Sequence, residues 1–268
     1  MTPAANTYIY PVQNGEIHRY AGTLWSSDYA NAFMMDRNLG AIAAESGEEP
    51  VKTYGLYYQW GRKDPFKSTG SVTTVAIDGT GAPGEGIIKQ NIRYSIHHPN
   101  TFLGGYGSNW TAYETTGVIL GSSTAAWNDS KTHSEDSEKA GFDRCEAGKS
   151  IYDPCPYGWQ VPKNGAWSDF DASNTEWSSA PAGRYYYPKG NAANGRVWYA
   201  SSGDISFLGG REWVEKNGDI WSSTPYSSSN SYYTTVTANG VTVSGTQWGM
   251  RAYGFSVRCI RTSYTTPY

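Results

Sequence analysis

From Arg184 to Arg261 the chain repeats one pattern, in which a short segment rich in aromatic and β-branched residues is followed by a Gly or Asn turn. The segments are "GRYYYP", "GRVWYA", "DISFLGG", "DIWSS", "SYYTTV", "GVTVSG" and "YGFSVRCIR". This rhythm is typical of antiparallel strands joined by hairpins. The last segment alternates apolar and polar residues, as a strand that covers a core does. A β-rich fold is therefore predicted for this half of the chain.

The first half is less regular. "TYIYPV", within residues 1–15, predicts an entry strand, and residues 67–125, rich in Gly, Ser and Thr, predict long loops and short strands. Helical turns are expected at Ser134–Ala140 and after "NGAW". No low-complexity linker divides the chain. We therefore expect one domain over residues 1–268, with an extended N-terminal strand and loop insertions around 67–125.

Composition excludes several classes of function. Only 17% of the residues are charged, the net charge is −3, and no basic stripe is visible, so we expect no nucleic-acid partner. No apolar run is long enough to span a bilayer directly. Aromatic residues reach 15%, with 22 Tyr and 11 Trp, which argues against disorder. These rings suit either a core or a contact surface.

Residues capable of metal or redox chemistry are few. The cysteines are Cys145, Cys155 and Cys259, and the histidines are His18, His97, His98 and His133. Three cysteines fit one disulfide plus a free thiol, or three reduced buried thiols. No zinc-type pair, HExxH, GxSxG or P-loop occurs, so no catalytic residue, cofactor or metal is predicted.

Five blocks carry a family resemblance: "DRNLGA", "GLYYQWGRKDPF", "IYDPCPYGWQVP", "IWSSTP" and "RAYGFSVRCIR". In order and content, from about Asn6 to Arg261, they resemble the Fibrobacter succinogenes major paralogous (FISUMP) domain of surface lipoproteins and fimbria-associated proteins of Bacteroidales. The resemblance implies an α+β, C-type-lectin-like fold with two helices, small twisted antiparallel sheets and long loops. It also implies export and a place at the cell surface, on the outer membrane or outside the cell. No signal peptide or lipid anchor opens the sequence, so an exported protein would have lost its leader.

The resemblance gives several blocks a role. The family pattern places one cysteine in "DPCPYGW" and one in "GFSVRC", which implies a structural disulfide between Cys155 and Cys259, with Cys145 outside the pattern. "GFSVRCIR" would be a central strand, and "DPCPYGWQVP" a rigid turn that leads into a helix. "WND" at Trp127–Asp129 resembles a lectin calcium motif, but it lies far from the last strand and has no partner motif, so chance explains it better.

The resemblance also indicates a binding role. In C-type-lectin-like folds the chain before the last strand forms the exposed loops of the binding face, and diversity-generating retroelements randomise that stretch in some members. Tyr, Ser and Asn are well suited to recognition. The predicted contacts for a glycan or protein ligand are Tyr226, Ser228, Asn230, Tyr232, Tyr233, Thr235, Asn239, Trp248, Met250 and Tyr253. An ordinary solvated hairpin over "SYYTTV" and "GVTVSG" is the competing interpretation.

Two further classes of function stay open. A structural fimbrial subunit would contact other subunits by strand addition, with "TSYTTPY" as the segment to test. An oxidase related to formylglycine-generating enzymes shares a similar fold and a similar end near "RCIR". That chemistry needs a second reactive cysteine, such as Cys145, or a histidine iron site.

Overall fold

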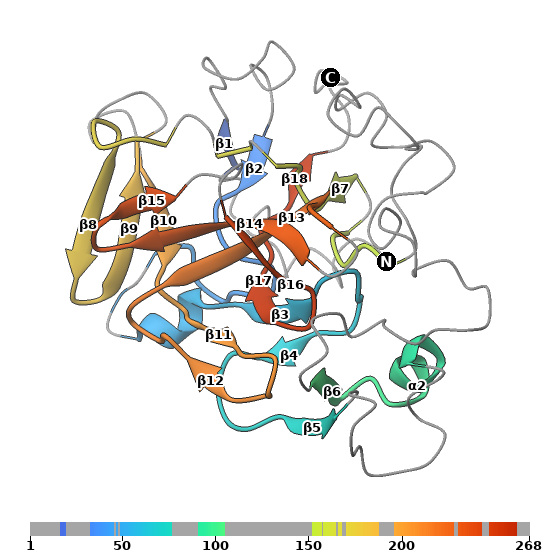
Figure 1. Ribbon diagram of the computed structural model, residues 1–268. Coiled ribbons are helices and arrows are strands. Elements are labelled where there is room, and N and C mark those ends of the chain that lie inside the picture. The colour runs from blue at the N-terminus through green and yellow to red at the C-terminus, as the bar shows by residue number, and fades with distance from the viewer. Residues whose placement is uncertain are drawn as a thin grey trace, which may run out of the picture.

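Strands dominate the structure, as the second half of the sequence predicts. Figure 1 shows the computed structural model. The residues that it describes are 17–19, 33–45, 47, 49–76, 91–104, 152–156, 158–164, 166–167, 170–187, 196–227, 230–242 and 247–261. Helices in this part of the chain are limited to the 3-10 helix η3 (Pro50–Thr53) and the α-helix α2 (Asn91–His97). The β-rich prediction is confirmed.

A nine-stranded sheet forms the centre of the molecule, in the order β12-β11-β17-β13-β14-β15, with β16 beside β14 and with β3 and β4 beside β17. Its strands are β3 (Leu56–Gln59), β4 (Phe66–Lys67), β11 (Asp204–Ile205), β12 (Arg211–Glu212), β13 (Gly218–Pro225), β14 (Asn230–Thr237), β15 (Gly240–Thr242), β16 (Trp248–Met250) and β17 (Gly254–Ser256). Most neighbours are antiparallel, while β13 and β17 are parallel.

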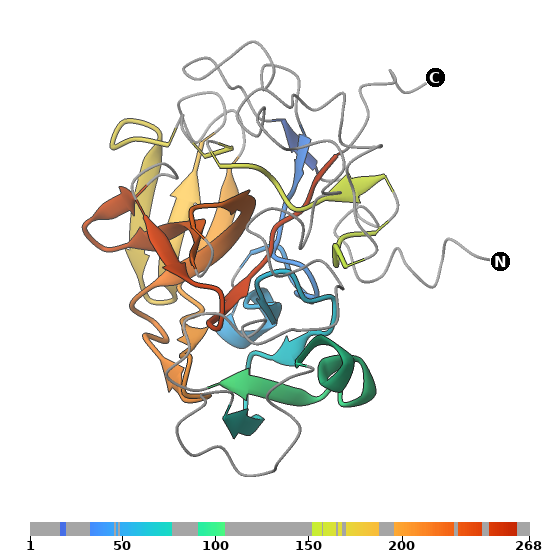
Figure 2. The ribbon, with the colours of Figure 1, turned by 45° about the vertical axis from the view of Figure 1, so that its right-hand side comes forward.

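Three smaller sheets surround this centre. One has the order β1-β2-β18-β7, one the order β10-β9-β8, and β5 and β6 pair in parallel. Their strands are β1 (Ile17–Arg19), β2 (Phe33–Met35), β5 (Thr73–Ala76), β6 (Thr101–Gly104), β7 (Trp159–Gln160), β8 (Thr175–Ser179), β9 (Ala182–Tyr186), β10 (Val197–Ala200) and β18 (Ile260–Arg261). Figures 1 and 2 both place β8–β10 and the group of α2, β5 and β6 at opposite ends of the molecule.

The last sequence block forms a central strand, as predicted, but it serves two sheets. β17 pairs with β3 along its length and with β11 and β13 at its two ends, and β18 then joins β2 and β7. Every residue from Gly254 to Ile260 is buried, so the expected polar face does not exist. Arg258 is accommodated because its guanidinium donates to Asn38 Oδ1 (3.2 Å) and to the Trp198 carbonyl (2.8 Å), and lies 3.7 Å above the Tyr199 ring.

Two large clusters of buried residues, one on each side of the central sheet, are rich in aromatic side chains. The first gathers Trp60, Trp221 and Phe255, and the second gathers Trp167, Tyr186 and Tyr199 around Ile220 and Val236. The largest fully buried side chains include four tryptophans, Trp60, Trp167, Trp198 and Trp221. Much of the aromatic content therefore fills the core, where rings bury more area than aliphatic side chains do.

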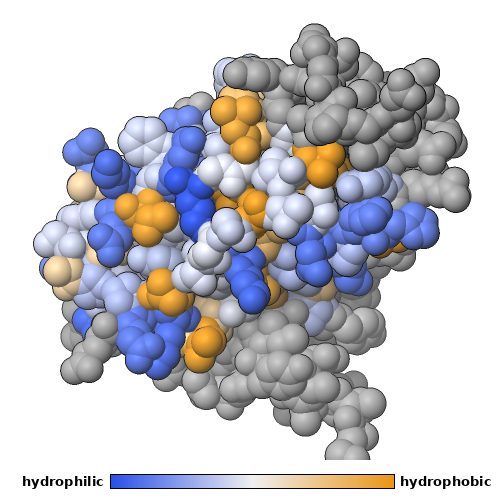
Figure 3. Space-filling view, turned by 90° about the horizontal axis from the view of Figure 1, so that it is seen from below, coloured by the Kyte–Doolittle hydropathy of each residue, from blue (hydrophilic) through white to orange (hydrophobic). Residues whose placement is uncertain are grey.

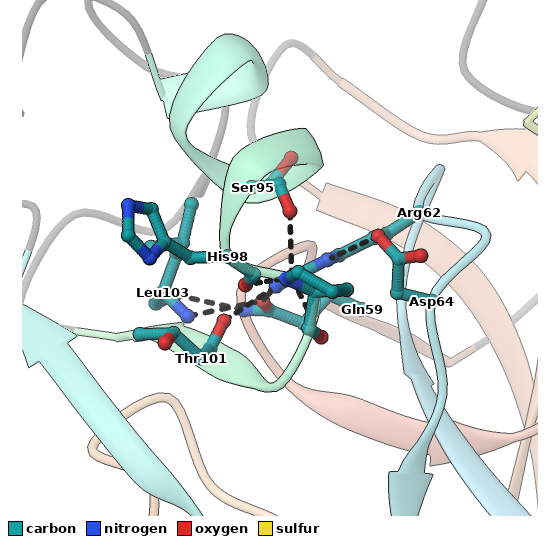
Figure 4. A network of polar contacts seen from close by, with 8 residues as sticks. Gln59, Arg62, Asp64, Ser95, His98, Thr101 and Leu103 are labelled. Carbon is teal, nitrogen blue, oxygen red and sulfur yellow. Dashed lines mark hydrogen bonds and ion pairs between the residues drawn. The ribbon is translucent and has the colours of Figure 1, made fainter.

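A buried arginine joins the segment that contains α2 to this core. The Arg62 side chain is only 2% exposed, and it donates to four main-chain carbonyls, those of Ser95 (3.4 Å), His98 (3.1 Å), Pro99 (3.1 Å) and Thr101 (2.8 Å). Its neighbour Gln59 accepts from Arg62 and from the Leu103 amide (Figure 4). These bonds satisfy carbonyls that otherwise would lose water without compensation on burial.

The disulfide between Cys155 and Cys259 is present, as the resemblance implies. Their Cα atoms lie 5.9 Å apart, and the bond links positions 104 residues apart in the sequence. Both cysteines belong to the first core cluster, beside Met35 and Val257. The bond therefore ties the "DPCP" turn to the segment between β17 and β18. The helix expected after this turn is replaced, in its described residues, by turns around Lys163–Ala166 and Trp167–Phe170. Cys145 and Ser134–Ala140 lie outside the described residues.

Reduction of this disulfide tests its structural role. In the chain-entropy view, opening a loop of this length lowers the free energy of unfolding by about 4–5 kcal/mol. We expect that loss in urea titrations of the protein with and without reductant, and in the Cys155→Ser/Cys259→Ser variant. The control is Cys145→Ser, which leaves the bond intact and should retain the stability of the oxidised protein. Equal stability with and without reductant would contradict this role.

Candidate functional site

The outward face of β14 and β16 gathers half of the predicted ligand contacts. The two strands are antiparallel, with Asn230 opposite Met250 and Tyr232 opposite Trp248. Paired residues share a face, and residues two apart along a strand share it too. These four residues therefore point to the same side of the β14–β16 ribbon, and Tyr226 joins them from the end of β13.

Three aromatic rings are in contact on this face, and we call them the aromatic cluster: Tyr226, Tyr232 and Trp248. The rings of Tyr226 and Trp248 are stacked, with centroids 5.2 Å apart and planes 1° from parallel. The Tyr232 ring meets Tyr226 edge to face at 5.3 Å. Tyr226 and Trp248 are each 49% exposed. Half-exposed rings held by one another offer a rigid apolar surface to a ligand at low entropic cost.

The turn between β13 and β14 is closed by hydrogen bonds that position Tyr226. The amides of Tyr226 and Ser227 both donate to the Asn230 carbonyl at 3.0 Å, and Ser227 Oγ accepts from the Asn230 amide at 3.1 Å. Beneath the turn, the Arg251 side chain donates to the Ser227 carbonyl (2.5 Å) and to Ser231 Oγ (3.1 Å). The backbone that carries the aromatic cluster is therefore fixed from below.

Arg251 is itself buried, at 2% exposure, and lies over the Trp60 ring with its Cζ atom 4.2 Å from the ring centroid. Burial lowers its pKa to about 10, so the guanidinium stays protonated at neutral pH. The cation thus belongs to the scaffold under the turn.

The inward face of the same ribbon is part of the core. Tyr233 packs against Trp221 and Phe255, with ring centroids 6.1 and 4.8 Å away. Gly249 allows this approach, because a Cβ there would lie 3.3 Å from both the Tyr233 and Phe255 rings. Burial raises the pKa of the Tyr233 hydroxyl above its usual range. The structure therefore places Tyr233 in packing, on the opposite face from its neighbour Tyr232.

The remaining predicted contacts lie elsewhere. Thr235 is buried opposite Asp219, and Asn239 is exposed in the turn after β14, at the end of that strand away from the aromatic cluster. Tyr253 packs edge to face on Phe207 at 5.5 Å. Ser228 lies outside the described residues. Most described residues of 222–253 lie in strands rather than loops. β14 and β15 form the hairpin that the alternative predicts, but it is not solvated throughout, because Thr234 and Thr235 are buried.

A buried pair of carboxyl groups went unnoticed in the sequence. Asp204 on β11 and Asp219 on β13 are 2% and 4% exposed, and their carboxyls interact with each other. Burial is the largest cause that raises the pKa of both groups, and for Asp204 the charges of Asp219 and Glu212 add to it. Two adjacent carboxylates away from water do not both ionise, so the pair holds a proton at neutral pH.

The residues considered for redox or metal chemistry are not brought together in the described part of the chain. Cys259 is bonded to Cys155, while the His98 ring stacks on Tyr94 at 4.1 Å. Among the described residues, no group of three or more His, Cys, Asp or Glu side chains could hold a metal ion. Cys145, His133 and Trp127–Asp129 lie outside the described residues.

Comparisons with known proteins identify no relative of this chain. No family model, no curated protein and no solved structure matches this chain. In the described part of the structure, no helix combines the length and the apolar character needed to cross a membrane.

The carboxyl pair predicts that stability falls as pH rises. Because folding raises both pKa values, the folded chain binds more protons than the unfolded chain. The contribution is complete below the ordinary Asp pKa, near 4, and is lost as pH rises through the raised pKa, which is about 8 for Asp204. We expect the free energy of unfolding to fall between pH 5 and pH 8, by at most about 1.4 kcal/mol per pH unit for each proton released.

Urea titrations across this pH range measure the slope. Asp204→Asn, which replaces one carboxyl by a neutral isostere, should flatten it. The control is Asp171→Asn, which removes an exposed carboxyl. Hydrogen bonds from Ser173 lower the pKa of that carboxyl, so its removal changes the pH dependence of stability only at more acidic pH. A slope unchanged by Asp204→Asn would contradict the shared proton.

Proposed function

We propose that this chain is a ligand-binding module displayed at a bacterial cell surface, an adhesin or fimbrial tip-type protein that recognises a glycan or a protein. The observation that carries the proposal is the aromatic cluster of Tyr226, Tyr232 and Trp248, exposed on a strand ribbon whose other face is core. Recognition sites commonly place such rings on a rigid scaffold. The Cys155–Cys259 disulfide is compatible with an exported protein.

The proposed family is the FISUMP domain and the proposed fold is C-type-lectin-like, on the strength of the sequence blocks. The central place of β17 and the β-rich architecture are compatible with that fold. The same proposal includes that a diversity-generating retroelement varies the segment before β17. Five of its proposed ligand contacts, Tyr226, Asn230, Tyr232, Trp248 and Met250, share one face.

Other exposed apolar residues are a weaker basis for recognition. Ile42, Val51, Ile96 and Leu208 are exposed on separate segments. On the face seen from below, apolar side chains form several separate groups among hydrophilic ones (Figure 3). Scattered apolar residues are normal on protein surfaces. The aromatic cluster differs because its exposed rings contact each other.

An array of glycans and host proteins tests the proposal directly. The purified protein is compared with the Tyr226→Ala/Trp248→Ala variant and with Trp213→Ala, which removes a ring of similar exposure (52%) from the segment after β12. We expect the double variant to lose binding while the Trp213 variant retains it. The Trp213 variant should unfold within about 0.5 kcal/mol of the unsubstituted protein. The double variant should stay folded but lose about 0.5–1.5 kcal/mol or more, because it removes a stacked pair of half-buried rings.

Binding that persists in the double variant would contradict this site. A folded protein that binds no probe but co-purifies with fimbrial subunits would instead favour a structural subunit.

A further inference from the structure

The segment that carries the aromatic cluster contains no residue that is charged at neutral pH. From Ser222 to Met250 the sequence has no Asp, Glu, Lys, Arg or His, although charged residues make up 17% of the chain. Asp219 and Arg251 are the nearest charged residues on either side, and they are 4% and 2% exposed. The ribbon and its turn therefore present a surface without formal charge.

The side chains around the rings are neutral hydrogen-bonding groups. Asn230 lies on the same face as Tyr232, and its side-chain amide donates to Ser227 Oγ at 3.2 Å. Arg251, the next charged residue after this segment in the sequence, directs its hydrogen bonds to the Ser227 carbonyl and Ser231 Oγ beneath the turn. A ligand on the outer face therefore meets aromatic rings, amides and hydroxyls.

This combination restricts the ligand. An anion that left water for such a surface would lose hydration with no opposite charge to compensate it. A cation would gain only the weak attraction of exposed aromatic faces. The core of a protein interface also concentrates Tyr, Trp and Met, but its rim commonly carries complementary charges, which this segment lacks. A sugar ring, in contrast, has apolar C–H faces that stack on aromatic rings and hydroxyl groups that bond to amides and hydroxyls.

We infer that the aromatic cluster binds an uncharged carbohydrate, with a pyranose ring stacked on the exposed Tyr226–Trp248 pair and its hydroxyls bonded to the neutral side chains around it. This inference rests on the proposed function and specifies its ligand class.

The test uses matched oligosaccharides. Neutral chains of hexose and N-acetylhexosamine are arrayed beside the same chains carrying a terminal sialic acid or a sulfate, with host proteins on the same array. We expect binding to neutral chains, weaker binding to their acidic forms, and little change between low and high salt, because no ion pair is screened. Trp248→Ala should weaken binding about tenfold or more, as expected for one lost stacked ring.

Trp213→Ala is the matched control and should bind as the unsubstituted protein does. A second outcome is that the aromatic cluster binds acidic glycans alone or proteins alone. Either result would contradict the assignment of an uncharged carbohydrate as the ligand, while the proposed recognition site would be retained. Binding of neutral chains that Trp248→Ala leaves unchanged would overturn the assignment to this face. Absence of binding to every probe would overturn both the inference and the proposed function.

Discussion

Buried guanidinium groups bonded to main-chain carbonyls hold this structure together. Arg62 binds the carbonyls of the segment that follows α2, Arg251 binds the turn between β13 and β14, and Arg258 binds the Trp198 carbonyl. A buried irregular segment must satisfy its own polar groups, and a forked donor satisfies several at once. The chain thereby packs irregular segments against an aromatic core without leaving their carbonyls unpaired.

Single strands of this structure carry core packing on one face and the exposed aromatic cluster on the other. On β14, Tyr233 and Ser231 point to the core while Tyr232 and Asn230 point away from it. Farther along the strand the outward side is covered as well, because Val236 packs with Ile220 and Tyr199 in the second core cluster. The exposed aromatic face is thus confined to the start of β14, where β16 lies beside it. Side chains on this face can therefore be substituted while the core cluster behind it stays intact.

Part of the fold could be predicted from the sequence. The strand segments after Arg184 were predicted because aromatic alternation and Gly or Asn turns are local signals, and the disulfide followed from the resemblance. Tyr232 and Tyr233 were both predicted as ligand contacts, although neighbours on a strand point to opposite faces. Which of the two rings faces the core depends on how the ribbon packs on Phe255. The burial of Arg258 and Ser256 could not be predicted for the same reason, because it depends on partners such as Asn38 that are distant in the sequence. The Asp204–Asp219 pair depends on the juxtaposition of β11 and β13, which no local pattern encodes.

The most direct test of whether a buried arginine preforms the proposed recognition face is amide hydrogen exchange. It is measured at Tyr226 and Ser227 in the unsubstituted protein and in Arg251→Met. Both amides donate to the Asn230 carbonyl, so they should exchange slowly in the unsubstituted protein and faster in the variant. The Tyr187 amide, bonded to the Asn174 carbonyl at 2.8 Å, should exchange at the same rate in both. Fast exchange of the turn amides in the unsubstituted protein, or equal rates in the two proteins, would contradict a face held in place by Arg251.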